Sequence, residues 1–423
     1  MPKLFTYLSG LLLLLTLQAC SSTDEPEPTS YYDGYAPQLM DRAVLEQSVT
    51  TLSARALHNT GKIYLYGRYL FINERYEGVH VIDNQNPALP RIVSFIRIPG
   101  NVDIAVKGNL LYADNGPDLV TIDITNPAQA QVQDRVRDAF RELPMPEMAP
   151  MPVECMPENR PANTVVVGWK KIQVPYTASP RSTTWWGRND APVVFNSASP
   201  TSAPGTTGKG GSLARFAILG QTLYTVDEQS LRTFSLGNPT QPAPGTRIQL
   251  QFGVETIYPK DHYLFLGTQR GMYIFDAATP QTPRQVAYYQ HVVSCDPVVV
   301  DNRYAYVTLR SGRSCGGGVN QLQVIDLTNL SQPRLAQTYP MLGPQGLGVD
   351  GNQLFVCDID GLKVFDTSQA PVLTQKQFFP IQVVDVIPDN GTLLAIGAAG
   401  LYQYSYTGAT LQQLSLLPIT PQP

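Results

Sequence analysis

The residues best placed to do chemistry recur at one position of a repeated sequence unit. Five of them are charged: Lys62, Asp103, Arg215, Asp296 and Asp385. Two carboxylates held close together, such as Asp103 and Asp296, are the pair that acid–base hydrolysis of a glycosidic bond requires. The same mixture of charges also fits a polar ligand or ion site, or a set of structural ion pairs that neutralise one another. The sequence leaves these alternatives open.

The repeat itself is seen in seven strand cores. Each core opens with an aliphatic residue or Met and ends, three residues later, in a large apolar residue; the cores span 79–82, 119–122, 231–234, 272–275, 322–325, 362–365 and 401–404. These two positions point to opposite sides of a strand, so both faces of the sheet are predicted to be buried. Further strands flank each core, which gives four-stranded units that recur about every 40 residues.

A repeat of this length with four strands per unit is typical of β-propeller blades. We therefore predict an all-β fold, a seven-bladed β-propeller whose blades contain strands a to d from the centre outwards. The aligned charged residues are then the first residues of the inner strands, and with Thr256 and Gly346 they ring one mouth of the central channel. The d–a connectors and b–c loops are expected on this same face.

Five strand cores are followed directly by aspartate, and the other two by serine. The aspartates are Asp83, Asp123, Asp276, Asp326 and Asp366, and a proline often follows four residues later. A carboxylate in this place accepts hydrogen bonds from the amides of the next turn, and proline ends the strand. We interpret these aspartates as turn caps rather than as repeated metal ligands or catalytic acids.

The stretches "GVHVIDNQNP" and "GMYIFDAATP" carry glycine, strand, aspartate and turn in one order, which resembles the LVIVD repeat of bacterial secreted β-propellers. The resemblance covers about residues 63–419 apart from one insertion, and units three and seven lack the aspartate. It implies the propeller fold and a place outside the cytoplasm. It implies no reaction, because the family carries no assigned activity.

Residues 1–19 have the composition of a signal peptide, with an early lysine, Lys3, and a short leucine-rich run. The end of this segment, "LQAC", resembles the bacterial lipobox, which implies cleavage before Cys20 and lipid attachment to that cysteine. The acidic, proline-containing stretch after it predicts a disordered tether over 20–48. Ser21 resembles the signal of lipoproteins sent to the outer membrane, and the acidic run resembles surface-export signals. We expect a lipid-anchored protein of the bacterial cell envelope.

An insertion at 139–212 interrupts the repeat between blades 2 and 3, on the side of the channel mouth. All three tryptophans lie in it: Trp169, Trp185 and Trp186. They either form a small core for the insertion or present aromatic faces to a ligand such as a sugar. Residues 49–57 are expected to pair with the C-terminal blade and latch the ring. Blades 1 and 2 then fall within 49–138, and blades 3 to 7 within 213–423.

Cys295 begins strand a of blade 5 and Cys315 lies in the b–c loop of the same blade, so both return to one end of one sheet. In an envelope compartment this arrangement predicts a disulfide. Met145, Met148 and Met151 carry thioethers that suit Cu(I), but the prolines between them favour a structural role. The sequence has no serine-hydrolase or zinc-protease motif. We expect no catalytic residue, metal or cofactor.

The net charge of −4 without a basic cluster argues against nucleic-acid binding. The main hypothesis is a lipid-anchored β-propeller that acts as a binding or scaffold module for a polar ligand, a glycan or a surface protein. One alternative is a glycan-active hydrolase or lyase that uses the carboxylates at the channel mouth. Another is a surface adhesin or assembly partner.

Overall fold

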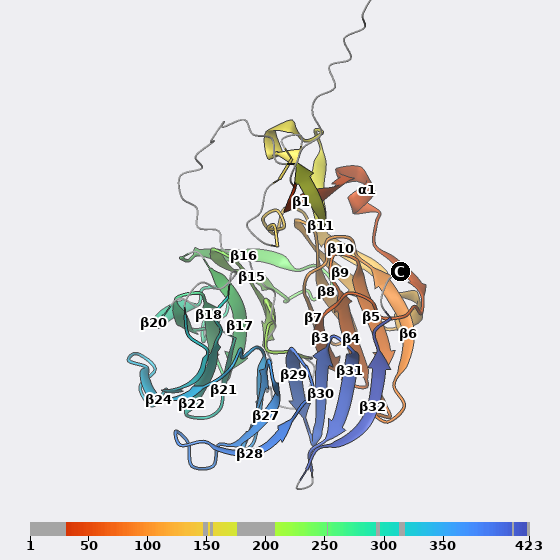
Figure 1. Cartoon of the computed structure of the whole chain (residues 1–423). Helices are drawn as coiled ribbons and strands as arrows, with labels where there is room; N and C mark the ends of the chain where they lie inside the picture. Colours follow the sequence, from red (N-terminus) through yellow and green to blue (C-terminus); the bar gives the residue numbers. More distant parts are fainter. Residues whose placement is uncertain are drawn as a thin grey trace, which may run out of the picture.

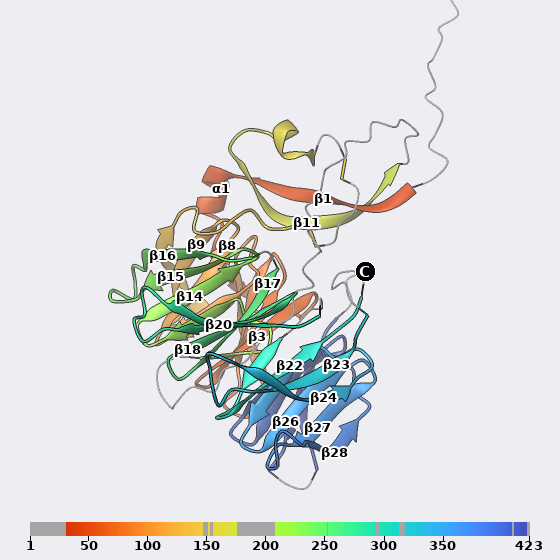
Figure 2. The same cartoon turned by 90° about the vertical axis from the view of Figure 1, so that its left-hand side faces the viewer.

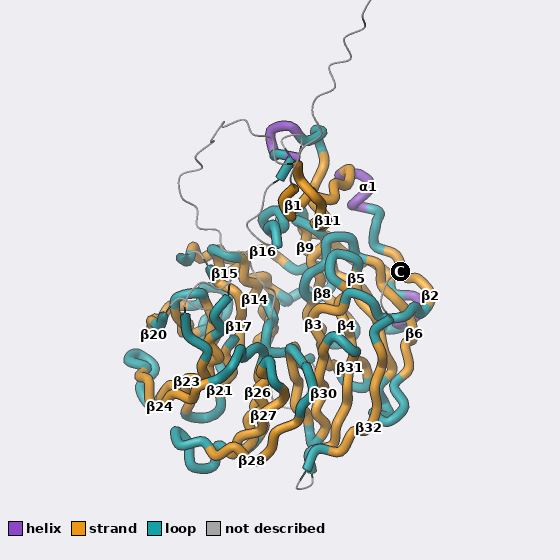
Figure 3. Tube along the Cα trace, viewed as in Figure 1, coloured by secondary structure: helices purple, strands orange, loops and turns teal. Residues whose placement is uncertain are grey.

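Seven β-sheets surround a central axis in the computed structural model, which describes residues 31–146, 151–152, 155–175, 208–251, 253–292, 297–312, 318–407 and 410–420 (Figures 1 and 3). The inner strands of neighbouring sheets contact each other around the whole ring, and β29 contacts β3 to close it. The chain is an all-β, seven-bladed β-propeller, as predicted. Among the described residues, no helix is long and apolar enough to cross a membrane.

Each blade is an antiparallel meander of four consecutive strands, which run in order from strand a at the channel to strand d at the outer edge. Blade 1 contains β3 (Thr60–Tyr66), β4 (Tyr69–Glu74), β5 (Gly78–Asp83) and β6 (Arg91–Arg97); blade 2 contains β7 (Ile104–Lys107), β8 (Leu110–Asn115), β9 (Asp118–Asp123) and β10 (Gln131–Val136). Blade 3 contains β13 (Phe216–Leu219), β14 (Thr222–Asp227), β15 (Ser230–Ser235) and β16 (Ala243–Gln249); blade 4 contains β17 (Val254–Lys260), β18 (Tyr263–Thr268), β19 (Gly271–Asp276) and β20 (Arg284–Gln290). Blade 5 contains β21 (Val298–Val300), β22 (Tyr304–Leu309), β23 (Gln321–Asp326) and β24 (Arg334–Pro340); blade 6 contains β25 (Leu347–Asp350), β26 (Gln353–Asp358), β27 (Gly361–Asp366) and β28 (Thr374–Phe379); blade 7 contains β29 (Asp385–Asp389), β30 (Thr392–Gly397), β31 (Gly400–Ser405) and β32 (Gln412–Pro418).

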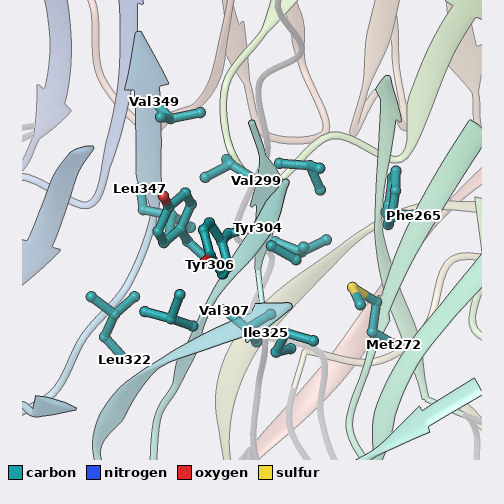
Figure 4. Packing of buried hydrophobic residues seen from close by; sticks show 14 of the residues in the cluster. Phe265, Met272, Val299, Tyr304, Tyr306, Val307, Leu322, Ile325, Leu347 and Val349 are labelled. Atoms are coloured by element: carbon teal, nitrogen blue, oxygen red, sulfur yellow. The ribbon is translucent and has the colours of Figure 1, made fainter. Parts of the chain in front are cut away.

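The core lies between the blades. Leu322 and Ile325, the first and last residues of one strand core, are both 0% exposed although they point to opposite faces of β23. One apolar cluster joins blades 4, 5 and 6, with Met272, Tyr306 and Leu347 among its members (Figure 4). Truncating a buried leucine in such a cluster typically costs about 2–5 kcal/mol of folding free energy. Packing between sheets therefore holds the ring together.

The aspartate after each strand core caps the following turn. The backbone N–H of Thr125 donates to Asp123 Oδ1 at 2.8 Å. The same bond, to the residue two positions on, forms at Asp83, Asp276, Asp326 and Asp366. Where serine replaces aspartate, Ser235 Oγ accepts from the N–H of Gly237 at 3.3 Å. The interpretation of these aspartates as turn caps is confirmed.

The turn prolines also join neighbouring blades through their carbonyl groups. Tyr112 of blade 2 donates its hydroxyl to Pro239 O in blade 3 at 2.8 Å, and Tyr224 of blade 3 donates to Pro280 O in blade 4 at 2.9 Å. Ser415 of blade 7 donates to Pro87 O in blade 1 at 2.6 Å. Proline turns thus end a strand and fix the position of the preceding blade.

The segment before blade 1 is placed differently from the prediction. Strand β2 (Thr50–Ser53) pairs with β6 and forms an extra outer strand of blade 1. The expected pairing with the C-terminal blade is limited to a parallel bridge between Leu57 and Ile419, supported by a 2.8 Å bond from Thr420 N to Leu57 O.

A two-stranded ribbon lies outside the propeller blades. It consists of β1 (Tyr31–Asp41) and β11 (Thr164–Pro175), and the short helix α1 (Arg42–Glu46) follows β1 (Figure 2). The expected disordered tether over 20–48 is therefore wrong from residue 31 onwards, because the partner strand is in the insertion, far away in the sequence. Two 3₁₀ turns, η1 (Pro127–Gln129) and η3 (Pro157–Asn159), complete the described elements.

A buried charge fastens the ribbon to blade 2. The side chain of Asp118 is fully buried, and it accepts from Arg42 at 2.9 Å and Arg135 at 2.6 Å. The N–H of Asp138 also donates to it, at 3.0 Å. A buried carboxylate with several donors is costly to leave unpaired, so this contact fixes where β1 and α1 sit.

Candidate functional site

The two faces of the ring differ in their loops. We call the face with the d–a connectors and b–c turns the connector face. We call the opposite face, which has the a–b and c–d turns and the capping aspartates, the turn-cap face. Lys62, Asp103, Arg215 and Asp385 lie at or just before the starts of inner strands, at the connector-face end of the channel. Asp296, predicted at the same position of blade 5, lies outside the described residues.

Lys62 and Asp103 form a buried ion pair between blades 1 and 2. Lys62 Nζ lies 2.8 Å from Asp103 Oδ2, and the two side chains are 6% and 3% exposed. Burial lowers the pKa of Lys62, against the opposing charge of Asp103. The same carboxylate accepts the backbone N–H groups of Arg215 and, at 3.2 Å, Phe216. Asp103 therefore links blades 1, 2 and 3.

The central channel contains a piece of the chain itself. Strand β12 (Lys209–Gly210) pairs antiparallel with β3, placing Lys209 opposite Leu65 and Gly210 opposite Tyr64. Because β3 is the innermost strand of blade 1, the edge that it offers to β12 faces the channel. We call residues 208–214 the channel segment.

Hydrogen bonds connect the channel segment to several blades at once. Gly208 N donates to Val106 O of blade 2 and Gly211 N to Ile63 O of blade 1, both at 3.0 Å. Leu347 N of blade 6 donates to Ser212 Oγ at 2.7 Å, and Ile257 N of blade 4 donates to Ala214 O at 2.9 Å. A segment that bonds to blades on opposite sides of the ring must lie within the channel.

Asp385 of blade 7 holds the channel segment from the other side. Its Oδ1 accepts the N–H of Ser212 at 2.8 Å, and its Oδ2 has no hydrogen-bond partner among the described residues. Burial raises the pKa of Asp385 well above its ordinary value, although the bonds from Ser212 and the charge of Lys62 act in the opposite direction. Burial therefore favours the protonated form of Asp385.

Of the residues predicted to ring the mouth, Asp385 holds the channel segment and Asp103 holds the two residues that follow it. Asp103 and Asp385 are 2% and 1% exposed, so the described part of the mouth offers no accessible pair of carboxylates. Arg215 directs its Nε to Val226 O at 3.1 Å. Thr256 is buried, and among the described residues its hydroxyl has no partner. Among the described residues, this end of the channel therefore presents buried carboxylates that are used in structural contacts.

Asp114 belongs to this region but is not predicted from the sequence. Its Oδ1 accepts from Val102 N at 2.7 Å and from Asp103 N at 3.1 Å. Burial raises the pKa of Asp114 to about 6, against those two amide bonds and together with the charge of Asp103. Asp114 and Arg215 line a cavity of about 70 Å³, which has room for about two water molecules but for no sugar ring.

A sequence signal for Asp114 does exist. An acidic residue lies at the end of the second strand of several blades, or one residue before the end in the case of Asp114, and it accepts N–H groups from the d–a connector that leads into the blade. In blade 1, Glu74 accepts from His58 N at 2.6 Å. In blade 6, Asp358 accepts from Leu342 N at 3.0 Å and Gly343 N at 2.6 Å. Aligning the ends of the second strands would have revealed these connector caps.

The insertion has a small core of its own, as one of the two interpretations of its tryptophans requires. Trp169 donates its indole N–H to Leu143 O at 3.1 Å and packs against the buried cluster of Val102, Leu143 and Val166. Its ring is therefore used to hold the ribbon on the connector face. The predicted Trp185 and Trp186, the lipid site Cys20, the disulfide Cys295–Cys315 and the methionine at 148 all lie outside the described residues.

A larger hollow, of about 470 Å³, lies on the turn-cap face between blades 6 and 7. Its charged groups are Asp366 and Lys376, which pair with each other at 3.3 Å. Asp366 is also a turn cap, so the charges at this site are already used in the architecture of the blade. The hollow supplies polar surface but no group free for chemistry.

Comparisons with known proteins agree with this fold. A family model described as the LVIVD repeat matches residues 100–138 and 294–340, which correspond to blades 2 and 5. A search of curated proteins finds no match. The chain is thus a β-propeller with LVIVD repeats, in agreement with the resemblance seen in the sequence.

Two solved structures show the same architecture at low sequence identity. Sqt1 of Saccharomyces cerevisiae is 10% identical, with 86% of this chain and 87% of that chain covered and a TM-score of 0.51. A protein from Lactobacillus plantarum is 12% identical, with 86% and 97% covered and a TM-score of 0.51. At these identities the similarity establishes the fold alone.

Proposed function

We propose that this LVIVD-repeat β-propeller is a lipid-anchored protein of the bacterial cell envelope that binds or scaffolds partners through its outer surfaces. The observation that carries the proposal is the channel segment, which occupies the place where many propellers hold a ligand. Of the carboxylates best placed for chemistry, Asp385 binds this segment, and Asp103 binds the amides of Arg215 and Phe216, which follow it directly. What remains available to a partner is the outside of the ring and the ribbon.

The proposed anchor rests on the sequence "LQAC" at 17–20 and the signal-peptide composition before it. Changing Cys20→Ala should move the protein from the membrane fraction to the soluble fraction, because acyl chains anchor stably while a propeller surface alone does not. Fractionation followed by mass measurement of the N-terminal peptide tests this. A variant that stays in the membrane fraction would contradict the anchor.

The glycan-active alternative receives no support from the described residues, because the mouth carboxylates are buried. Incubating the purified full chain with envelope polysaccharides is expected to release no new reducing or unsaturated ends. Steady release of such ends, lost on heat denaturation, would replace the scaffold proposal with an enzymatic one. The adhesin or assembly role is a form of the scaffold proposal and predicts the same result.

A further inference from the structure

Four large apolar side chains are exposed on the connector face of blade 6. Leu342 is 61% exposed, Ile359 60%, Phe378 44% and Val384 36%. Single apolar residues on a surface are ordinary, but several gathered on one face of one blade indicate a contact surface. We call these four residues the blade 6 patch.

One connector links three members of the patch. Asp358 accepts the N–H groups of Leu342 at 3.0 Å and of Ile359 at 2.8 Å, so one carboxylate holds the backbone at both residues. At the other end of the connector, Gly346 N donates to Val384 O at 3.0 Å. Gly361 lies against the ring of Phe378, two residues from Ile359.

The polar groups under the patch are already paired. Lys363 forms ion pairs with Asp358 and, at 2.9 Å, with Asp360. Together with its bonds to the connector amides, this leaves the Asp358 carboxylate neutralised and fully buried. The surface that blade 6 offers to its surroundings is therefore set by the apolar side chains.

The turn-cap face differs chemically from the connector face. It carries exposed ion pairs at the turn caps of several blades: Arg68–Asp83, Arg303–Asp326 and Lys376–Asp366. Such pairs keep a surface hydrated. The two faces of the ring are thus unlike, and only the connector face of blade 6 gathers exposed apolar groups of this size among the described residues.

The position of the chain's N-terminal part indicates what covers the patch. The ribbon sits on the connector face, where Val166 and Val167 approach Gly116 and Gly100 of blades 1 and 2 (Figure 2). Residues 21–30 separate Cys20 from Tyr31, the first residue of the ribbon. A fully extended chain spans at most about 3.6 Å per residue, so a lipid on Cys20 lies within roughly 40 Å of the ribbon's end.

We propose that the blade 6 patch rests on the lipid bilayer to which the protein is anchored. This inference rests on the proposed lipid attachment at Cys20. The ribbon stands on the side of blades 1 to 3, across the ring from β27 and β28 of blade 6 (Figure 1). The anchored ribbon and the patch then form two separated contacts with the same bilayer. Leucine, isoleucine and phenylalanine side chains gain free energy on entering the boundary between headgroups and acyl chains.

The test uses the acylated full chain in vesicles of phosphatidylethanolamine and phosphatidylglycerol that contain a diazirine-bearing phosphatidylcholine. After photolysis, peptides that carry Leu342 and Ile359 should be labelled by lipid. The peptide that carries Val372 is the internal control, since this residue is 61% exposed on the turn-cap face of the same blade. We expect patch peptides to carry roughly tenfold more lipid than the control peptide, as burial of one such side chain predicts.

Matched variants sharpen the test. Ile359→Asp should reduce labelling of the patch peptides to the level of the control, whereas Val372→Asp should leave it unchanged. Equal labelling of both faces, or labelling confined to the ribbon, would overturn the inference while leaving the anchor intact. An unmodified Cys20 would overturn the anchor and the inference together. A detergent-solubilised dimer that Ile359→Asp dissociates would assign the patch to a second copy of the chain instead.

Discussion

Asp103 and Asp385 occupy the same position of the repeat but differ in what holds them. Asp103 pairs with Lys62 and accepts backbone amides, so its charge is balanced. Asp385 accepts one amide of the channel segment and keeps a buried oxygen without a partner among the described residues. The sequence identifies both as charged residues at a channel mouth. It cannot reveal that residues 208–214 enter the channel, or that Ser212, Arg215 and Phe216 donate their backbone amides to these two carboxylates.

The raised pKa of Asp385 predicts a specific dependence of stability on pH. Above the ordinary value of 3.8 the unfolded chain loses this proton while the folded protein keeps it, so the stability that Asp385 contributes falls as pH rises. In Asp385→Asn the amide keeps an acceptor for Ser212 and has no proton to lose. The variant should therefore gain stability relative to the wild type as pH rises above about 4.

Denaturant unfolding at several pH values measures this difference. Asp385→Ala is the contrasting variant, because it leaves the Ser212 amide without an acceptor and should cost about 1–3 kcal/mol throughout. A wild type that gains stability relative to Asp385→Asn as pH rises would show that Asp385 is ionised in the folded protein.

Glu74 predicts the opposite dependence. Burial opposes its ionisation, but the bonds and charges of His80, the amide of His58 and Arg55 outweigh burial and lower the pKa of Glu74 to about 2. Its contribution is present above the ordinary value of 4.5 and is lost as pH falls towards 2. Glu74→Gln should cost up to about 3 kcal/mol at neutral pH and little near about pH 2.

Glu77→Gln is the matched control for Glu74→Gln, because Glu77 also pairs with Arg55 but its side chain is 42% exposed. Its loss should cost less than about 1 kcal/mol. Equal effects of the two substitutions in denaturant unfolding would refute the role given to the buried carboxylate.

At the scale of elements, the strands are predictable and their additions are not. Strand cores that are apolar on both faces, together with turn prolines and a capping aspartate or serine, indicate all seven blades, because each signal is local and repeated. The ribbon and the channel segment depend on pairing between distant segments. Strand β1 meets β11, and β12 meets β3, although nothing in the local sequence marks them as partners. Placing them requires the assembled ring.

The channel segment has a sequence suited to a narrow space. A Cβ on Gly208 would overlap the ring of Tyr64, and a Cβ on Gly211 would overlap Oδ2 of Asp385. Gly211→Ala should therefore destabilise the protein by about 1–3 kcal/mol, as overpacked sites do. Thermal or denaturant unfolding provides the measurement.

Gly237→Ala is the control for Gly211→Ala. A Cβ at this position meets nothing closer than Ser235 Oγ at 3.5 Å, which is an ordinary contact. Its effect should stay within about 0.5 kcal/mol. If Gly211→Ala were equally mild, residues 208–214 would not be confined as described.

At the scale of the whole molecule, the protein is a ring that is closed at its centre and asymmetric on its two faces. Residues 208–214 lie in the channel. The turn-cap face carries paired charges, and the connector face carries the ribbon and the blade 6 patch. Because the described part of the channel holds residues 208–214, the proposed function relies on the outer surfaces of the ring. The proposed anchor then decides which surface faces the membrane and which faces a partner.

The central claim, that residues 208–214 close the channel, is tested most directly by hydrogen–deuterium exchange of the native full chain. The amides of Gly208, Gly211 and Ser212 donate to Val106, Ile63 and Asp385 in the interior of the ring. The peptide that covers 208–214 is therefore predicted to exchange as slowly as the inner strand β3, with protection that only sub-global opening removes. Exchange at the rate of an exposed loop would show that the channel is open and would contradict this claim.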